Sequence, residues 1–111
     1  MQRDRLLLTE IVGAGERIIE LSAGRDVADV EANRDVRHAL LWNDTVLGEA
    51  ASQVSQELRD THPDVPWSDP VRLRNRIVHG YWSIELDVLT STASQDLPGM
   101  LAAVRQIIEE L

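Results

Sequence analysis

Residues 7–21, LLTEIVGAGERIIEL, carry the pattern that decides the fold. Apolar residues recur there at spacings of three and four, which places them on one stripe of an α-helix: Leu7, Ile11, Ala14, Ile18 and Leu21. The pair Ala23-Gly24 then signals the end of the helix, because glycine is the preferred residue just past a helix C-terminus. The segment therefore predicts a long amphipathic helix whose apolar stripe other helices must cover.

Two further segments repeat this pattern and predict helices over about 34–61 and 96–111. The apolar stripe of the first is Leu40, Leu47, Ala51, Val54 and Leu58, and that of the second is Leu97, Leu101, Val104, Ile108 and Leu111. His62-Pro63 ends the first of them, since the residue before a proline is pushed out of helical geometry. Asn43 and Asp44 interrupt its stripe with polar groups.

Shorter helices are expected between these three. Residues 71–79 read as one, closed by Gly80, and residues 83–94 as another, whereas residues 26–31 read as a short helical turn or loop. The chain lacks Phe, so Leu, Ile, Val and Ala must fill the core, a palette that suits helices better than sheets. We therefore expect an all-α, four- to five-helix up-and-down bundle that forms a single domain over residues 1–111.

Composition limits the possible functions. The chain has no Cys, which excludes disulfides and thiolate metal sites, and no apolar stretch approaches the length of a membrane span. The charged, amphipathic start does not resemble a signal peptide, so the expected compartment is the cytoplasm. The net charge is −8 and every basic residue is Arg. Any nucleic-acid binding must therefore depend on a local basic cluster, and Arg72, Arg74 and Arg76 provide one.

Residues 73–82, LRNRIVHGYW, hold the densest group of chemically useful side chains. Asn75 and His79 are four residues apart, so they share a helix face and could hydrogen-bond. Arg74 and His79 are five apart, about 140° around an ideal helix, and would converge only if the helix loosens near Gly80 or a second subunit completes the site. An Arg that binds phosphate and a His that moves protons suit phosphodiester chemistry. A surface Arg and a capping His remain the alternative.

The segment Arg74-Asn75-x-x-x-His79-Gly80-Tyr81 resembles the R-x4-H-x-Y motif of the HEPN superfamily, specifically of the HepT-like toxins. The resemblance extends over nearly the whole chain, through Asp4-Arg5-Leu6, Leu47-Gly48-Glu49-Ala50-Ala51, His62 to Trp67 and Asp96-Leu97-Pro98. It implies a HEPN-type homodimer that cleaves RNA, either tRNA or mRNA, without a metal or a cofactor. It also implies a partner, a nucleotidyltransferase antitoxin of the MntA type, which silences the ribonuclease by transferring AMP onto a tyrosine.

By position, the resemblance makes Arg74 and His79 catalytic, with Asn75 in support, and makes Tyr81 the AMP acceptor. Arg72 and Arg76 would bind RNA phosphate. The expected mechanism is attack of the RNA 2′-hydroxyl on the adjacent phosphate, assisted by His79, which leaves a cyclic 2′,3′-phosphate. The alternative function is a helical module that binds a nucleotidyltransferase or RNA and does not cut.

Other polar and aromatic residues have competing interpretations. Asp44 and Glu49 could line the cleft and orient Arg74, or serve as an exposed acid or a buried salt bridge. His38 and His62 are too isolated to predict a metal site, and His62 is expected to cap a helix end. The three tryptophans are expected in core or interface packing, with stacking on an RNA base as a second possibility for the last: Trp42, Trp67 and Trp82.

Overall fold

The computed structural model describes residues 2–111, and every regular element in that range is helical. The four longer helices are α1 (Gln2–Ser22), α3 (Arg34–Gln53), α5 (Ser68–Gly80) and α7 (Leu97–Glu110). The shorter elements are α2 (Val27–Ala32), α4 (Gln56–Thr61), α6 (Leu86–Ser91), the 3-10 turn η1 (Tyr81–Ser83) and the π-helical segment η2 (Thr92–Asp96). The all-α prediction is confirmed.

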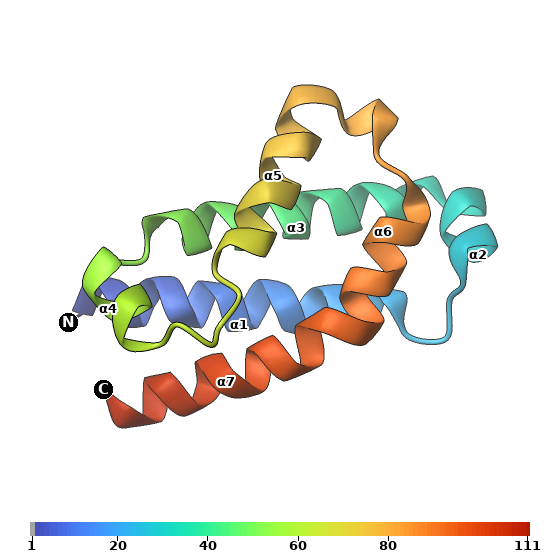
Figure 1. Cartoon of the computed structure of the whole chain (residues 1–111). Coiled ribbons are helices and arrows are strands. Elements are labelled where there is room, and N and C mark those ends of the chain that lie inside the picture. The colour runs from blue at the N-terminus through green and yellow to red at the C-terminus, as the bar shows by residue number, and fades with distance from the viewer. Residues whose placement is uncertain (1) are drawn as a thin grey trace.

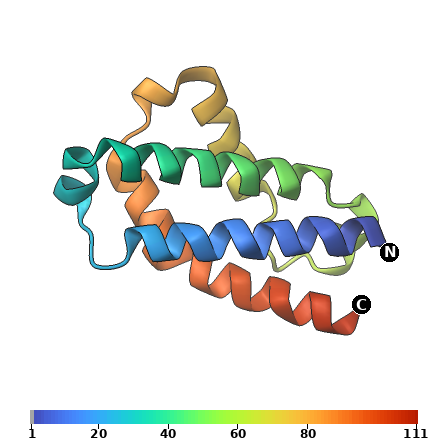
Figure 2. The same cartoon turned by 180° about the vertical axis from the view of Figure 1, so that it is seen from behind.

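The long helices form a layered bundle. Helix α1 lies between α3 and α7, and both of these run antiparallel to it, so the two chain ends lie at the same end of the bundle (Figures 1 and 2). Helix α5 crosses α3 steeply and continues beyond its edge, and α6 returns the chain towards α7 (Figure 1). The segment from α5 to α6 therefore projects from the bundle, and it carries the predicted site.

The predicted stripes form the core. In α1 the buried residues include Leu8, Ile11, Ala14 and Ile18. The expected stripe began at Leu7, whereas the structure buries Leu8 in its place. Gly15 is also buried, and a Cβ there would lie 2.5 Å from a methyl of Leu101. The glycine therefore lets α7 approach α1 closely at the centre of the core.

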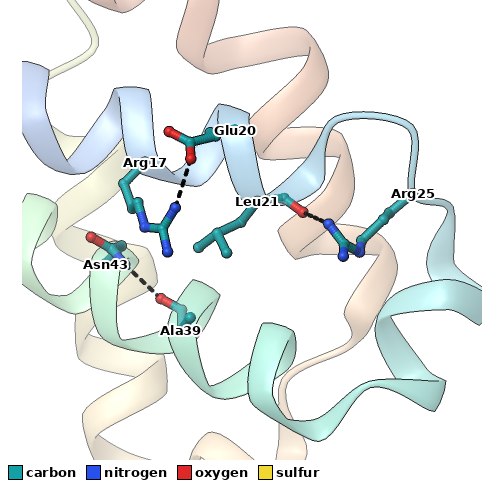
Figure 3. A network of polar contacts seen from close by, with 6 residues as sticks. All are labelled: Arg17, Glu20, Leu21, Arg25, Ala39 and Asn43. Atoms are coloured by element: carbon teal, nitrogen blue, oxygen red, sulfur yellow. Dashed lines mark hydrogen bonds and ion pairs between the residues drawn. The ribbon is translucent and has the colours of Figure 1, made fainter.

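Figure 3 shows polar contacts near the end of α1 and in α3. Gly24 adopts a positive φ of 71° after α1, and Arg25 Nη1 donates to the Leu21 carbonyl oxygen at 2.8 Å. On α3, Asn43 Nδ2 donates to the Ala39 carbonyl oxygen, also at 2.8 Å. Asn43 thus interrupts the apolar stripe while its amide donates one hydrogen bond within its own helix.

The single helix expected over residues 34–61 is wrong, because the chain extends at Val54 and Ser55 and divides it into α3 and α4. Ser55 caps the new helix by accepting from the Leu58 backbone N–H at 3.2 Å. The break is anchored from α1, where Asp4 accepts from the Ser55 backbone N–H at 2.9 Å and from its hydroxyl at 2.6 Å. Val54 and Leu58 are buried on both sides of the break, so the apolar stripe continues through it.

Three other boundaries also differ from expectation. Helix α5 begins at Ser68, earlier than predicted, because a proline is tolerated in the first turn and Pro70 falls there. Residues 83–94 do not form one helix but α6 followed by η2. Residues 26–31 largely become the helix α2, which begins at a capping box between Asp26 and Asp29.

Candidate functional site

The predicted site lies on α5 and on the 3-10 turn that follows it. Leu73 and Ile77 are buried and form a small second apolar cluster with Ile84 and Leu89 from beyond the turn. The Ser83 hydroxyl donates to the Gly80 carbonyl oxygen at 2.7 Å, and this bond caps the end of α5. The cluster and the cap fix the direction in which the motif side chains leave the helix.

A close helix crossing positions Arg74. A Cβ added to Gly48 of α3 would lie 2.3 Å from the Arg74 Cβ and 2.5 Å from the Pro70 carbonyl oxygen. Only glycine fits at this point, because real side chains do not approach so closely. The Gly48-Glu49 pair thus brings the backbone of α5 against α3 and places an acid beside the arginine.

Glu49 holds the guanidinium of Arg74. Arg74 Nη1 lies 3.1 Å from Glu49 Oε2, and the Arg74 side chain is only 25% exposed. Its Nε is buried and has no hydrogen-bond partner among residues 2–111. The ion pair agrees with the possibility that Glu49 orients Arg74, whereas Asp44 forms no ion pair with Arg74 within residues 2–111.

His79 and Asn75 lie on a different face of α5 from Arg74. Both are exposed, but within the described residues they form no hydrogen bond with each other, so the predicted orientation of the imidazole by Asn75 is not observed. Arg74 and His79 are separated by five positions of regular helix, about 140° around its axis. One protomer therefore presents the arginine beside α3 and the histidine to solvent.

The basic cluster is likewise divided. Arg72 forms an ion pair with Asp69 and donates to the Ser68 hydroxyl at 3.1 Å, one turn earlier in the same helix. Arg76 is exposed and has no ion-pair partner within residues 2–111. The three arginines therefore do not form one cationic surface: Arg72 and Arg76 share a side with His79, and Arg74 lies across the helix.

Tyr81 stands at the end of a shallow apolar groove between α3 and α5, which we call the α3–α5 groove and which is lined by His38, Leu41, Trp42, Thr45, Ile77, Val78 and Tyr81. The Tyr81 side chain is 56% exposed, and its ring meets that of Trp82 edge to face, with centroids 5.4 Å apart. Trp42 and Val78 are also largely exposed. The groove continues along α3 to Arg74 and Glu49.

The remaining aromatic and histidine expectations have mixed outcomes. Trp67 is buried and its Nε1 donates to the His62 carbonyl oxygen at 2.9 Å, which confirms core packing for this tryptophan. His62 ends α4, as predicted. Trp42 is exposed and does not belong to the core. Among residues 2–111, no three His, Cys, Asp or Glu side chains gather in a way that could hold a metal ion.

Asp44 is the second buried acid of the molecule, but within residues 2–111 it lacks the salt bridge that was one of the expected alternatives for it. It is 4% exposed and lies in the wall of a partly open pocket on the side of α5 away from the α3–α5 groove. Its Oδ2 has no hydrogen-bond partner among the described residues. Burial raises the pKa of Asp44 to about 7, because a carboxylate without a partner is poorly solvated there.

Comparison with known proteins assigns the family. Residues 11–107 match the family described as ribonuclease HepT-like, and the chain belongs to this family. The chain is 28% identical over 94 residues to a Methanocaldococcus jannaschii protein named "Putative RNase MJ1380", covering 85% of the chain and 86% of that protein. It is 26% identical over 93 residues to the "Probable ribonuclease HepT" of Thermococcus cleftensis, covering 84% of each. The family assignment supports ribonuclease activity.

A protein of Caldanaerobacter subterraneus named "Putative RNase TTE0752" is 24% identical over 110 residues, which is 99% of the chain and 98% of that protein. No solved structure gives a significant match. Within residues 2–111, none of the helices is both long enough and apolar enough to cross a membrane.

Proposed function

We propose that this ribonuclease is the toxin of a toxin–antitoxin pair, that it works in the cytoplasm on tRNA or mRNA without a metal, and that AMP transfer onto Tyr81 silences it. The observation that carries the proposal is the arrangement of the motif on α5. Glu49 holds Arg74 through an ion pair. His79 and Tyr81 follow Arg74 closely in the sequence, and both are exposed to solvent. This arrangement gives phosphate binding, proton transfer and a modifiable hydroxyl to one short segment.

In the proposed reaction, the RNA 2′-oxygen attacks the adjacent phosphorus while His79 takes the 2′-hydroxyl proton. The bond from phosphorus to the 5′-oxygen breaks, the 5′-oxygen takes a proton from solvent water, and a cyclic 2′,3′-phosphate remains. His79 returns its proton to solvent, so the protons balance. Arg74 stabilises the charge that develops on the phosphoryl oxygens. Glu49 holds the guanidinium in place before substrate arrives, so less side-chain freedom is lost on binding.

The separation of Arg74 and His79 around α5 supports a homodimeric site. Because one helix does not aim both groups at one phosphate, a second copy of the chain would supply the missing group. The exposed apolar side chains Trp42, Val78 and Tyr81 lie in the α3–α5 groove next to Arg74, and an apolar surface of this kind favours burial against a partner. Light scattering should detect a dimer at micromolar concentration, and Val78→Glu should dissociate it.

Cleavage assays test the catalytic assignment. Purified protein should cut RNA in the presence of EDTA, and Arg74→Ala or His79→Ala should each lower the rate on the order of 10²–10³-fold. Arg105→Ala is the matched control, because Arg105 is an exposed arginine of α7 that pairs with Glu16 far from the motif. If both motif variants cut as fast as the parent, the chain is a binding module, and if EDTA stops cleavage, the metal-free mechanism is wrong.

Labelling tests the assignment of Tyr81. We expect the AMP phosphate to pair with Arg74, Arg76 and His79, which would then no longer bind RNA phosphate. Incubation with ATP and an MntA-type nucleotidyltransferase should add one or more AMP masses and stop cleavage, and Tyr81→Phe should prevent both. Since the chain has no other tyrosine, a Tyr81→Phe protein that is still labelled and silenced would refute the assignment.

A further inference from the structure

Trp82 is the most exposed large apolar side chain among residues 2–111, with 77% of its surface open to solvent. It belongs to η1, in the part of the chain that projects from the bundle (Figure 1). It is a member of neither apolar cluster, and it is not among the residues that line the α3–α5 groove, which the proposed dimer would bury. The indole therefore has no packing role in the core or in that groove.

The neighbours of Trp82 hold its ring in place. Tyr81 meets it edge to face, and a Cβ added to Gly80 would lie 3.7 Å from Trp82 Cζ2, so the indole rests beside the Gly80 backbone. Two hydrogen bonds fix the turn: the Ser83 hydroxyl donates to the Gly80 carbonyl oxygen at 2.7 Å, and the Ile84 N–H donates to the Tyr81 carbonyl oxygen at 3.3 Å. A ring held in this way loses little freedom when a flat ligand binds to it.

The indole lies close to the histidine that would act on RNA. Trp82 follows His79 by three residues, and three residues of chain span at most about 11 Å between Cα atoms. When the ribose 2′-oxygen of one nucleotide meets His79, the base of that nucleotide or of its neighbour can therefore reach the indole.

Few cations on this side of the molecule are free to bind RNA phosphate. Arg72 and Arg74 are each paired with an acid, and Glu85, just beyond the turn, is exposed. Because cations supply most of the affinity of a protein for the RNA backbone, phosphate contacts alone would bind RNA weakly here. Stacking of a base on an aromatic ring needs no charge and contributes on the order of tenfold in affinity. A stacking contact at Trp82 would supply affinity that the paired arginines do not.

We propose that Trp82 is a stacking platform for one unpaired RNA base beside the scissile phosphate. The indole covers a face of the base while Arg74 and His79 act on the phosphate and the ribose. A base inside a duplex has both faces covered by its neighbours, so the substrate is RNA that is single-stranded at the cut. The proposal rests on the proposed ribonuclease function, because it names the class of RNA that this enzyme accepts.

Binding of a 2′-O-methyl RNA oligonucleotide tests the platform without cleavage, because the attacking hydroxyl is blocked. Trp82→Leu should weaken binding on the order of tenfold, whereas Trp82→Phe keeps an aromatic ring and should retain most of the affinity. Leu6→Ala is the control, since Leu6 is an exposed apolar residue of α1. If Trp82→Leu binds as tightly as the parent, the proposal is overturned.

A series of these oligonucleotides, each lacking one base, shows whether Trp82 contacts a base. At one position the missing base should cost the parent on the order of tenfold in affinity, while Trp82→Leu should lose nothing further there. A series that weakens both proteins alike would contradict the platform. Light scattering supplies a second check, because a Trp82→Leu protein that loses the oligomeric state of the parent would show that the indole packs between subunits, which also overturns the proposal.

Cleavage of a stem–loop RNA separates this inference from the proposed function. The parent should cut in the loop and spare the stem. Trp82→Leu should raise KM on the order of tenfold with kcat little changed, because a stacked base is bound alike before and during the reaction. An enzyme that cuts the stem as fast as the loop refutes the platform and leaves the ribonuclease assignment intact. A protein that shows the expected binding losses but never cuts RNA refutes the proposed activity and supports the platform.

Discussion

The two buried acids of this protein, Asp4 and Asp44, lie in regions that differ in the hydrogen-bond donors they offer to a carboxylate. Asp4, near the start of α1, receives two hydrogen bonds from Ser55 at the junction of α3 and α4. Asp44, in the middle of α3, receives none at its Oδ2 from residues 2–111 and lines a cavity. Both are almost inaccessible to solvent, so the difference lies in their partners and not in their burial.

The pKa values follow these partners. Burial by itself would raise the pKa of Asp4, but the hydrogen bonds from the Ser55 hydroxyl and backbone N–H outweigh it and lower that pKa. Burial raises the pKa of Asp44 to about 7 because no partner compensates it. The first carboxyl ties distant segments together, and the second destabilises the fold.

The largest expected effect comes from removing the paired acid. Asp4→Ala should lower the free energy of unfolding by about 3 kcal/mol, because two charge-assisted hydrogen bonds are lost and the Ser55 N–H is left in a half-buried site. Urea denaturation measures this, with Asp64→Ala, an exposed acid in a turn, as the control. A loss no larger than that of the control would mean that the junction is held by apolar packing alone.

The next effect is a pH dependence that belongs to Asp44. Its folded-state pKa lies above its unfolded value, so between these values the folded state binds the extra proton and stability falls as pH rises. From pH 5 to pH 7 the free energy of unfolding should drop by about 2 kcal/mol, and Asp44→Asn should remove most of this drop. Thermal unfolding of both proteins across this range measures the difference. Identical profiles would show that Asp44 is ionised in the fold throughout.

The contrast between these acids also marks what the sequence could predict. Stripes at three- and four-residue spacing predicted the long helices, because burial of one helix face leaves a local signal. The break at Ser55 left no such signal, since Val54 and Leu58 keep the stripe going and the anchoring Asp4 is 51 residues away. The spacing of apolar residues along one helix cannot indicate a hydrogen-bond partner 51 residues away in the sequence.

The candidate site shows the same division. Helix arithmetic alone predicted that Arg74 and His79 would diverge, and regular helix from Ser68 to Gly80 maintains that divergence. Which side of α5 would meet α3 depended on the close crossing at Gly48, a contact between separate segments. For that reason the sequence left open whether Asp44 or Glu49 would orient Arg74, and in the structure Arg74 pairs with Glu49.

A smaller effect, of opposite sign to the first, comes from filling the position of the unpaired acid. Asp44→Leu should raise the free energy of unfolding at pH 7 by about 1–2 kcal/mol, because an apolar side chain replaces a buried carboxyl without a partner. Urea denaturation with Asp96→Leu as the control measures it. A destabilised Asp44→Leu protein would show that the carboxyl is paired in solution and would remove the contrast with Asp4.

The smallest effect comes from removing the hydroxyl of Ser55. This change separates the contributions of the two hydrogen bonds that Ser55 donates to Asp4. Ser55→Ala removes the 2.6 Å bond to Asp4 Oδ2 and the cap on the Leu58 N–H, but it keeps the backbone bond to Asp4 Oδ1. The free energy of unfolding should therefore fall by about 1 kcal/mol, typical of a lost N-cap and less than for Asp4→Ala.

The pKa of Asp4 should rise in this variant, because a bond that favours its charged form is gone, so acid unfolding should begin at a higher pH. Ser52→Ala is the control, since the Ser52 hydroxyl only returns to the Glu49 carbonyl of its own helix. If the two serine variants share one acid-unfolding midpoint, the hydroxyl of Ser55 does not set the charge state of Asp4.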